Sequence, residues 1–192
     1  MVFKDKGVSF ASGGKDSILA MHIASSEGIR IESVMTMLPE DPESMLYHTH
    51  NVSIVEKVAE AIGVPWIPVP AAKDRELVAL EKALAELGAD YLITGGIEST
   101  FQKKRFDEVC EKSDLHHYAP LWHNSPREVY DKLTSFRIDA IIVAVAAYGL
   151  GRDWLGSHLT PDTIRTLLNA AKKYGFNAVG EGGDLDTLVL DA

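Results

Sequence analysis

Short apolar runs alternate along this chain with longer segments in which apolar residues recur every three or four positions. The apolar runs predict strands over Val8–Ala11, Ile31–Met37, Trp66–Val69, Tyr91–Thr94, Ile138–Val145 and Leu188–Leu190. The three- and four-residue spacing predicts helices over Asp16–Glu27, Val52–Ile62, Arg75–Leu87 and Gln102–Lys112. This alternation indicates an α/β fold in which helices cover a parallel sheet.

Capping residues support several of these helix ends. Gly63, Gly88 and Gly175 each follow a helical pattern, where the left-handed backbone of a helix cap favours glycine. Thr160 and Pro161 predict a further helix that runs to about residue 174, because threonine caps helices and proline suits the first helical position.

The chain has a softer boundary near residues 123–126, where His, Asn, Ser and Pro follow one another. We therefore expect a larger domain over residues 1–123 and a smaller C-terminal α/β domain over residues 124–192. A length of 192 residues is sufficient for this arrangement.

Charge and cysteine content narrow the function classes. The net charge of −9 argues against a broad nucleic-acid-binding face. Cys110 is the single cysteine, which excludes a disulfide framework or a cysteine-based zinc site, and we expect it to face the core. The sequence contains no secretory signal pattern and no apolar run of bilayer length. We expect a cytoplasmic protein without membrane contact, and a homo-oligomer remains open.

The most informative segment is Ser12-Gly13-Gly14-Lys15-Asp16-Ser17, between the first predicted strand and helix. Two glycines let backbone N–H groups approach an anion, and a helix N-terminus adds its positive dipole end. Lys15 adds a charge, and the Ser12 and Ser17 hydroxyls can donate to phosphate oxygens. Asp16 stands where a Walker A loop has Ser or Thr. The loop can therefore hold a pyrophosphate and leave the α-phosphate open to attack.

Two other loops follow predicted strands, and ligands bind at such carboxyl ends. Residues 39–51 include Tyr47 and His48, which we expect to line a pocket. Residues 95–100, with Gly95, Gly96 and Ser99, form a second candidate anion-binding turn.

Three basic residues, at positions 103–105, lie near the start of the next predicted helix. Positive charge there is unfavourable with respect to the helix dipole. These basic residues therefore indicate a function other than stabilising the helix. We favour Gln102 and Arg105 as ligand contacts, whereas Lys103 and Lys104 suit a solvated face.

Carboxylates and glycines gather near residues 180–187. Glu181, Asp184 and Asp186 could hold Mg²⁺, attract an ammonium ion or accept its proton. A solvated acidic turn built around Gly182 and Gly183 is an equally good explanation from the residues alone.

The aromatic and histidine positions are weaker signals. Trp122 suits the core or a pocket wall, and core packing is the usual outcome for an aromatic among apolar neighbours. The pairs His48/His50 and His116/His117 have no acidic or cysteine partner at metal-ligand spacing. We expect surface or hydrogen-bonded histidines.

Six ordered segments resemble the diphthine–ammonia ligase family, a branch of the PP-loop ATPases, and its archaeal members in particular. These segments are Ser12–Ser17, Tyr47–Asn51, Gly96–Arg105, Ala119–Trp122, Gly149–Leu150 and Gly180–Asp191. The resemblance implies a five-stranded parallel sheet flanked by helices, of the adenine nucleotide α-hydrolase (HUP) type, with a smaller C-terminal domain. The chain departs from the family at Asp184 and Asp186, where glutamates are usual, and at Phe101, where tyrosine is usual.

The resemblance also implies a reaction. ATP activates the carboxylate of diphthine, a modified histidine on translation elongation factor 2, and ammonium then displaces AMP to give diphthamide. The reaction would pass through an acyl-adenylate and release pyrophosphate. No cysteine follows Met1 as a glutaminase would require, so free ammonium is the expected nitrogen donor.

Each site residue receives a role from this resemblance. The Ser12–Ser17 loop would hold the β- and γ-phosphates, and Asp16 would position Mg²⁺. Adenine would lie near Met35 and Met37, and Gly95 and Gly96 would face the α-phosphate or ribose. Lys15, Asp16, Glu181, Asp184 and Asp186 would be catalytic. The substrate would contact Tyr47, His48, Ser99, Gln102, Arg105, Trp122, Gly182, Gly183 and Thr187.

Two alternatives stay open. One is a PP-loop ligase that amidates another carboxylate, such as a corrinoid, and the other is a non-catalytic sensor of ATP or AMP. A tRNA-thiolating enzyme fits less well, given one cysteine and an acidic chain.

Overall fold

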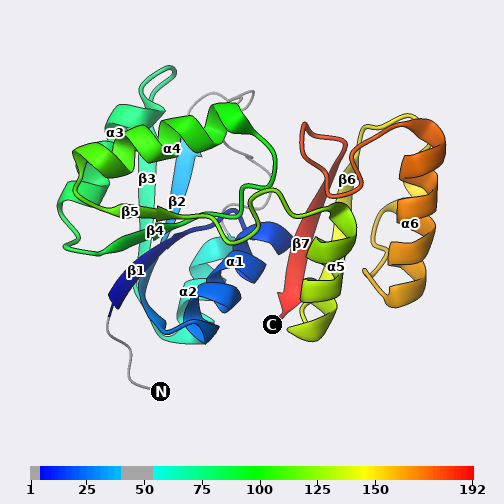
Figure 1. Cartoon of the computed structure of the whole chain (residues 1–192), viewed down its shortest axis with the longest axis horizontal. Helices are drawn as coiled ribbons and strands as arrows, with labels where there is room; N and C mark the ends of the chain where they lie inside the picture. The colour runs from blue at the N-terminus through cyan, green and yellow to red at the C-terminus, as the bar shows by residue number, and fades with distance from the viewer. Residues whose placement is uncertain (1–4, 40–53) are drawn as a thin grey trace.

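The computed structural model describes residues 5–39 and 54–192, and its architecture confirms the predicted α/β fold (Figure 1). Five strands pair in parallel to form one sheet, in the order β3-β2-β1-β4-β5. The strands are β1 (Asp5–Phe10), β2 (Ile29–Pro39), β3 (Trp66–Ala71), β4 (Tyr91–Ile93) and β5 (His116–Tyr118).

The strand order creates a switch point between β1 and β4. The chain leaves β1 toward β2 and β3 on one side, then crosses over to β4 and β5 on the other. Connections therefore diverge at the carboxyl ends of β1 and β4, where open α/β sheets bind ligands. The glycine loop after β1 and the glycine pair after β4 both begin at this point.

Two layers of helices cover the sheet (Figure 1). Helices α1 (Lys15–Ser26) and α2 (Val55–Ile62) lie on one face, and α3 (Glu76–Ala85) and α4 (Thr100–Lys112) lie on the other. Apolar side chains of β1, β2 and β4 pack against α3 and α4, with Leu80 and Phe106 buried there. Cys110 is buried in that same cluster, as its helical position predicts.

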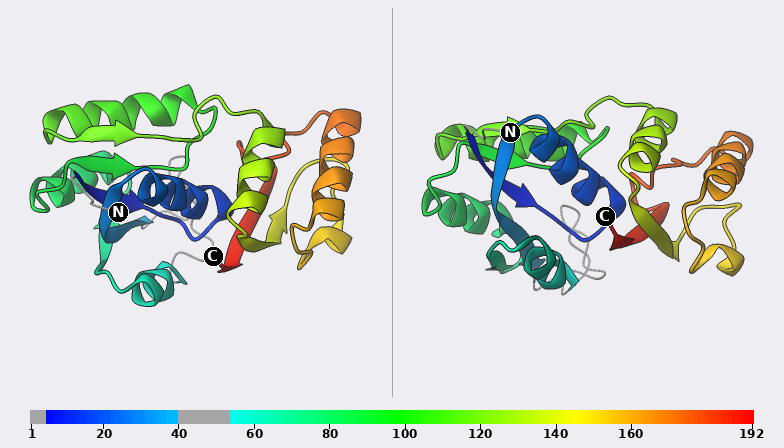
Figure 2. Two further views of the ribbon diagram at one scale, coloured as in Figure 1. Left: turned by 60° about the horizontal axis from the view of Figure 1, so that its bottom comes forward. Right: turned by 90° about the horizontal axis from the view of Figure 1, so that it is seen from below.

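The C-terminal part forms a second, smaller layer beside the sheet (Figure 2). Strands β6 (Asp139–Val145) and β7 (Leu185–Asp191) pair antiparallel. They are accompanied by α5 (Pro126–Ser135), the 3-10 helix η2 (Arg152–Trp154) and α6 (Pro161–Tyr174). One apolar cluster runs from Leu19 in α1 to Leu133 in α5 and Leu167 in α6, so the core is continuous across the expected boundary at residue 123.

The structure corrects the sequence prediction at two elements. The fifth strand of the parallel sheet is β5, whereas the apolar pattern predicts only four strands there. The predicted strand at residues 138–145 is present as β6 and belongs to the antiparallel pair. Helix α5 is also missed, although Ser125 and Glu128 form a capping box with proline at the first helical position. Gly63 and Gly175 adopt the predicted left-handed caps. Over the described residues, no helix has the length and apolar character needed to span a membrane.

Candidate active site

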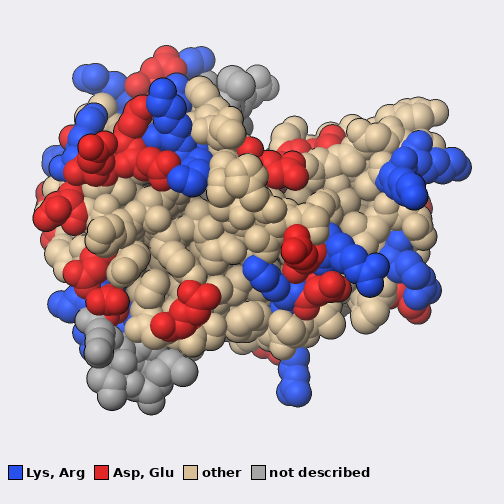
Figure 3. All heavy atoms as spheres, viewed as in Figure 1, with Lys and Arg blue, Asp and Glu red and all other residues tan. Residues whose placement is uncertain are grey.

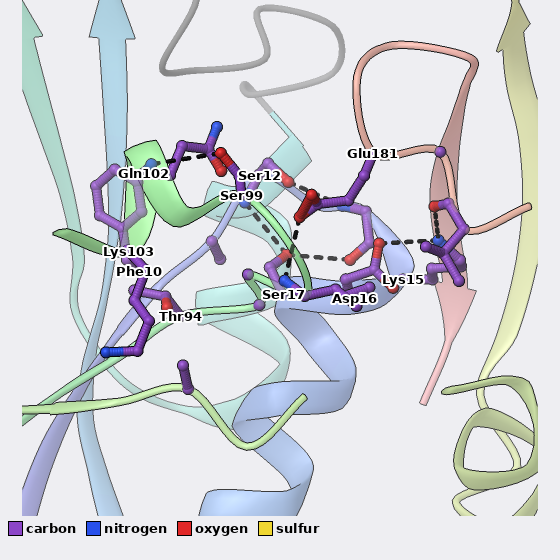
Figure 4. Close-up of a pocket in the computed structure, with 18 of the residues that line it drawn as sticks. Phe10, Ser12, Lys15, Asp16, Ser17, Thr94, Ser99, Gln102, Lys103 and Glu181 are labelled. Atoms are coloured by element: carbon purple, nitrogen blue, oxygen red, sulfur yellow. Dashed lines mark hydrogen bonds and ion pairs between the residues drawn. The ribbon is translucent and has the colours of Figure 1, made fainter. Parts of the chain in front are cut away.

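A cavity of about 530 Å³ opens at the carboxyl ends of β1 and β4, and the molecular surface is hollowed there between the two halves (Figure 3). Both halves contribute to its walls, as the close-up shows (Figure 4). It brings together most of the predicted site residues. These are Ser12, Gly14, Lys15, Asp16, Ser17, Met37, Gly95, Gly96, Ser99, Gln102, Trp122, Glu181, Gly182, Gly183, Asp186 and Thr187.

A few predicted residues do not line this cavity. Met35 is fully buried beneath it in the sheet core. Arg105 stacks on the exposed ring of Phe101, with its guanidinium carbon 4.1 Å from the ring centre, so the cation favoured by the sequence turns away. Tyr47 and His48 lie outside the described residues.

Glycine is required at two positions around the first loop, Gly13 and Gly95. Gly13 has a left-handed backbone with φ of 81°, and Gly14 is the extended residue at which α1 begins. Gly95 packs so closely that a Cβ there would lie 2.6 Å from the backbone of Asp16 and Ser17. The end of β4 is therefore pressed against the first turn of α1.

The first loop suits an anion. Ser12 and Ser17 line the cavity beside the N-terminus of α1, and the N–H groups of a first helical turn attract negative charge. Ser17 Oγ donates to the Gly14 carbonyl at 3.0 Å, which fixes the hydroxyl at the mouth of the loop. The positive end of α1 and the Ser12 hydroxyl beside it suit a phosphate group.

Strand β7 completes the same loop from the far end of the chain. The backbone N–H of Val189 donates to the Gly13 carbonyl at 3.0 Å. The backbone N–H of Lys15 donates to the Thr187 hydroxyl at 3.1 Å. Thr187, predicted to contact substrate, thus lines the cavity and also holds the loop.

Lys15 has a different setting from the one its sequence position suggests. Its side chain is 1% exposed, and Nζ donates to the Val179 carbonyl at 2.6 Å and to Asp16 Oδ2 at 2.8 Å. Nζ also lies 5.8 Å from the ring centre of Tyr130. The ammonium group therefore connects the first loop to the C-terminal half.

The three carboxylates of the acidic segment do not act as one cluster. Glu181 Oε1 accepts from the backbone N–H groups of Ile97 and Glu98, at 3.1 and 3.2 Å. Asp184 Oδ2 accepts from the Asn177 N–H at 2.7 Å and does not line the cavity. Only Glu181 and Asp186 face it.

Acidic and histidine side chains are the groups in this cavity that could bind a metal ion. Among the described residues, no group of three or more His, Cys, Asp or Glu side chains could hold a metal ion. Asp16 faces the cavity, so a magnesium ion there would rely on one carboxylate and on the phosphates it accompanies. Such a donor set is common for Mg²⁺, which keeps several waters and binds through few protein carboxylates.

The α4 side of the cavity holds a chain of side-chain hydrogen bonds. Thr94 Oγ1 and His117 Nε2 lie 2.8 Å apart, and His117 Nδ1 and Asp107 Oδ1 lie 2.6 Å apart. Lys103 Nζ donates to Asp107 Oδ2 at 2.6 Å, and it lies 5.6 Å from the ring centre of Trp122. Thr94, Lys103, His117 and Trp122 all line the cavity.

Burial and nearby charges determine the protonation states of His117, Asp107 and Cys110. Burial lowers the pKa of His117 below its ordinary value, against the opposing effect of the Asp107 carboxylate. Burial tends to raise the pKa of Asp107, but hydrogen bonds from Lys103 and His117 outweigh it, so the carboxyl pKa is lowered. Burial and the nearby Asp107 raise the pKa of the Cys110 thiol to about 12. In this series of hydrogen bonds, His117 is therefore a neutral imidazole and Asp107 is an ionised carboxylate.

Sequence patterns locate only part of this chain of contacts. His117 is hydrogen-bonded, as expected for one of the histidine pair. Lys103, expected on a solvated face, lines the cavity instead, and Trp122 forms a cavity wall rather than core. Thr94 and Asp107 carry no motif, because they lie 23 and 10 residues from His117 and meet it only through the fold.

Comparison with known proteins adds two domain matches. Residues 5–117 match the family of the diphthamide synthase N-terminal domain, and residues 125–192 match that of the diphthamide synthase C-terminal domain. The similarity therefore extends over both sides of the cavity.

Several relatives are similar over nearly the whole chain. Diphthine–ammonia ligase of Danio rerio is 30% identical over 208 residues, covering 96% of this chain and 81% of that protein. The human protein of the same name is 28% identical, covering 94% of this chain and 76% of its own length. The protein of that name from Schizosaccharomyces pombe is 28% identical, covering 97% of this chain and 34% of its own length.

Proposed function

The chain belongs to the diphthamide synthase family, and on that premise we propose that it amidates diphthine on translation elongation factor 2. ATP would activate the diphthine carboxylate as an acyl-adenylate with release of pyrophosphate. Ammonium would supply the nitrogen, and AMP would leave as diphthamide forms. The relatives carry the name diphthine–ammonia ligase, which is consistent with this reaction.

The observation that carries the proposal is the union of two distant segments in one cavity. The glycine loop after β1 offers an anion site, and the acidic segment before β7 faces it across the same space. A nucleotide sensor needs the first segment alone, whereas an amide ligase also needs a place for a cationic nitrogen donor. The hydrogen bonds from Val189 and Lys15 fasten these two segments together.

The residues present fit the nucleotide. We propose that Ser12–Ser17 hold the β- and γ-phosphates, that Gly95 and Gly96 lie beside the α-phosphate or ribose, and that adenine lies near Met37, with Met35 supporting it from the core. Mg²⁺, held by Asp16 and the phosphates, would neutralise negative charge during the transfer.

The remaining residues would serve the protein substrate and ammonium. Ser99 caps α4 through the Gln102 N–H, which places both side chains at the rim of the cavity (Figure 4). Trp122 forms the adjoining wall. Glu181 and Asp186 would attract the ammonium ion, and Asp184 would hold the turn at Gly182 and Gly183 by its bond to the Asn177 N–H.

Radiolabelled ATP and purified elongation factor 2 test the proposal. The factor is taken from cells that lack this gene, so that it carries diphthine, and is mixed with the protein, ATP and ammonium chloride. We expect sustained release of AMP and pyrophosphate only when factor and ammonium are both present, together with the mass change from carboxylate to amide. ADP as product would contradict adenylation, and binding without turnover would support the sensor.

A further inference from the structure

The hydrogen bonds of His117 determine which way the Thr94 hydroxyl points. An ionised carboxylate only accepts hydrogen bonds, so the bond to Asp107 requires that His117 Nδ1 carry a proton. The neutral ring then has a lone pair on Nε2, and Thr94 must donate its hydroxyl proton there. The oxygen lone pairs of Thr94 are left for the cavity that it lines.

Thr94 lines the cavity at the carboxyl end of β4. It directly follows β4 and precedes Gly95 and Gly96, beside the first turn of α1. The backbone N–H of Thr94 donates to the Tyr118 carbonyl at 3.0 Å, which fixes the residue between β4 and β5. Its hydroxyl is therefore held by two strands and by a buried imidazole that is 4% exposed.

Resting on the proposed function, we infer that Thr94, backed by His117, accepts the proton that ammonium must lose before it attacks the activated carboxylate. One N–H bond of ammonium breaks, and its electron pair stays on nitrogen. The proton bonds to Thr94 Oγ1 as the threonine passes its own proton to His117 Nε2. The freed nitrogen pair forms the C–N bond, the nitrogen then loses a second proton to solvent, and the acyl–oxygen bond breaks with its electrons leaving on AMP, which gives the neutral amide.

The charges around the ring suit this transfer. Protonation of His117 creates a cation beside Asp107, whose carboxylate offsets it across 2.6 Å. Within residues 5–39 and 54–192, the other charged group that acts on the ring is Lys103, which Asp107 also binds. The ring of Phe106 packs beside the imidazole, with centres 5.6 Å apart. A neutral imidazole in this setting is a competent proton acceptor at neutral pH.

The acidic segment provides weaker candidates for the same task. The Glu181 carboxylate already accepts hydrogen bonds from two backbone N–H groups, which occupy its Oε1. Asp184 is bonded to the Asn177 backbone away from the cavity. Asp186 lines the cavity and is the rival that an experiment must separate.

Comparing two nucleophiles, ammonium and hydroxylamine, distinguishes a role of Thr94 and His117 in proton removal from other roles of these residues. Hydroxylamine is largely neutral at pH 7 and attacks without first losing a proton, whereas ammonium is almost entirely protonated. We compare T94V, H117Q, T94S and D186N with the unaltered protein, using elongation factor 2 that carries diphthine. Pyrophosphate exchange into ATP measures adenylation separately. H116Q is the control, since His116 is the exposed neighbour of His117.

We expect T94V and H117Q to lose about 10²-fold or more of the ammonium-dependent rate, a typical contribution of general base catalysis. Pyrophosphate exchange and the hydroxylamine rate should stay within about threefold of the unaltered protein, and T94S should restore the ammonium rate because it keeps the hydroxyl. H116Q should behave like the unaltered protein.

Three results would overturn the inference. One is a parallel loss of pyrophosphate exchange and of both amine reactions in T94V, because this would indicate a structural or nucleotide-binding role. Another is an ammonium-selective loss in D186N without one in T94V. An unchanged ammonium rate in T94V is the third. The proposed function fails separately, by the absence of pyrophosphate exchange in the unaltered protein with either amine.

Discussion

The two walls of the cavity are built by different kinds of hydrogen bond. On the β7 side, backbone groups make or receive the bonds, as between Val189 and Gly13 or between Glu181 and the N–H groups of Ile97 and Glu98. On the α4 side, the bonds join side chains, from Thr94 through His117 and Asp107 to Lys103. The first wall depends on chain geometry and the second on residue identity.

The two walls should therefore respond to different changes: the β7 wall to changes in side-chain volume and the α4 wall to changes in protonation. A wall held through the backbone changes little with pH and is sensitive to added volume, because main-chain atoms cannot move aside. A wall held through titratable side chains tolerates small shifts but responds to protonation. Substitutions on the two sides should therefore fail in different ways.

The largest effect is expected for Gly95→Ala. The new Cβ would lie 2.6 Å from the backbone of Asp16 and Ser17, so the first turn of α1 must move. We expect a loss of about 1–3 kcal/mol in the free energy of unfolding, as for other overpacked sites, and loss of nucleotide binding. Urea unfolding and calorimetric titration with ATP measure both.

Gly96→Ala is the matched control for that substitution. A Cβ at Gly96 meets nothing within 4 Å, so stability should change by less than about 0.5 kcal/mol, as is usual away from such packing constraints. Equal destabilisation by the two variants would show that close packing of β4 on α1 is not what fixes the loop.

Glu181→Ala should have the next largest effect. It removes the acceptor of two backbone N–H groups, and bonds to a charged partner at a partly exposed site are worth about 1–2 kcal/mol together. Glu98→Ala is the comparison, because Glu98 accepts at 3.0 Å from the half-buried side chain of Asn177 instead. A loss in Glu98→Ala as large as in Glu181→Ala would remove the distinction between backbone and side-chain partners.

The pH dependence of stability should then distinguish the α4 wall. Burial lowers the pKa of His117 in the folded protein, so its contribution is fully present above the ordinary histidine pKa of about 6.5 and is lost as pH falls. His117→Gln should therefore flatten the decline of unfolding free energy between about pH 6.5 and 5.

His22 provides the control for this pH series. Burial lowers its pKa as well, and it lies in α1 away from the α4 wall. His22→Gln should remove only its own share of the decline and leave that of His117, so the double variant should be flatter than either single variant. Identical slopes in the unaltered protein and His117→Gln would contradict the assignment.

The smallest effect is expected for Lys103→Met. Its ammonium group loses contact with Asp107 and the Trp122 ring, which together are worth about 0.5–1 kcal/mol at a partly exposed site. Lys104→Met should change less, because Lys104 is 79% exposed and its carboxylate partner lies 3.9 Å away. Urea unfolding measures the free energy of unfolding of both variants. A larger loss in Lys104→Met than in Lys103→Met would contradict this order.

The sequence predicts the β7 wall better than the α4 wall. Glycine loops and strand-to-helix turns leave local patterns, and so do the caps at Gly63 and Gly175. Strand β5 has three residues, two of them histidines, so no apolar run marks it. The contacts of His117 depend on how β4, β5 and α4 come together, and no spacing along the chain encodes them.

The bond from Val189 to Gly13 gives the protein an order of assembly during synthesis. A ribosome adds roughly 5–20 residues per second, so the strands of the parallel sheet exist for several seconds before β7 is made. Throughout that time the glycine loop lacks its partner for the Gly13 carbonyl. A nascent chain therefore acquires this bond only once β7 has been made, and we expect chains that lack β7 to bind the proposed nucleotide poorly.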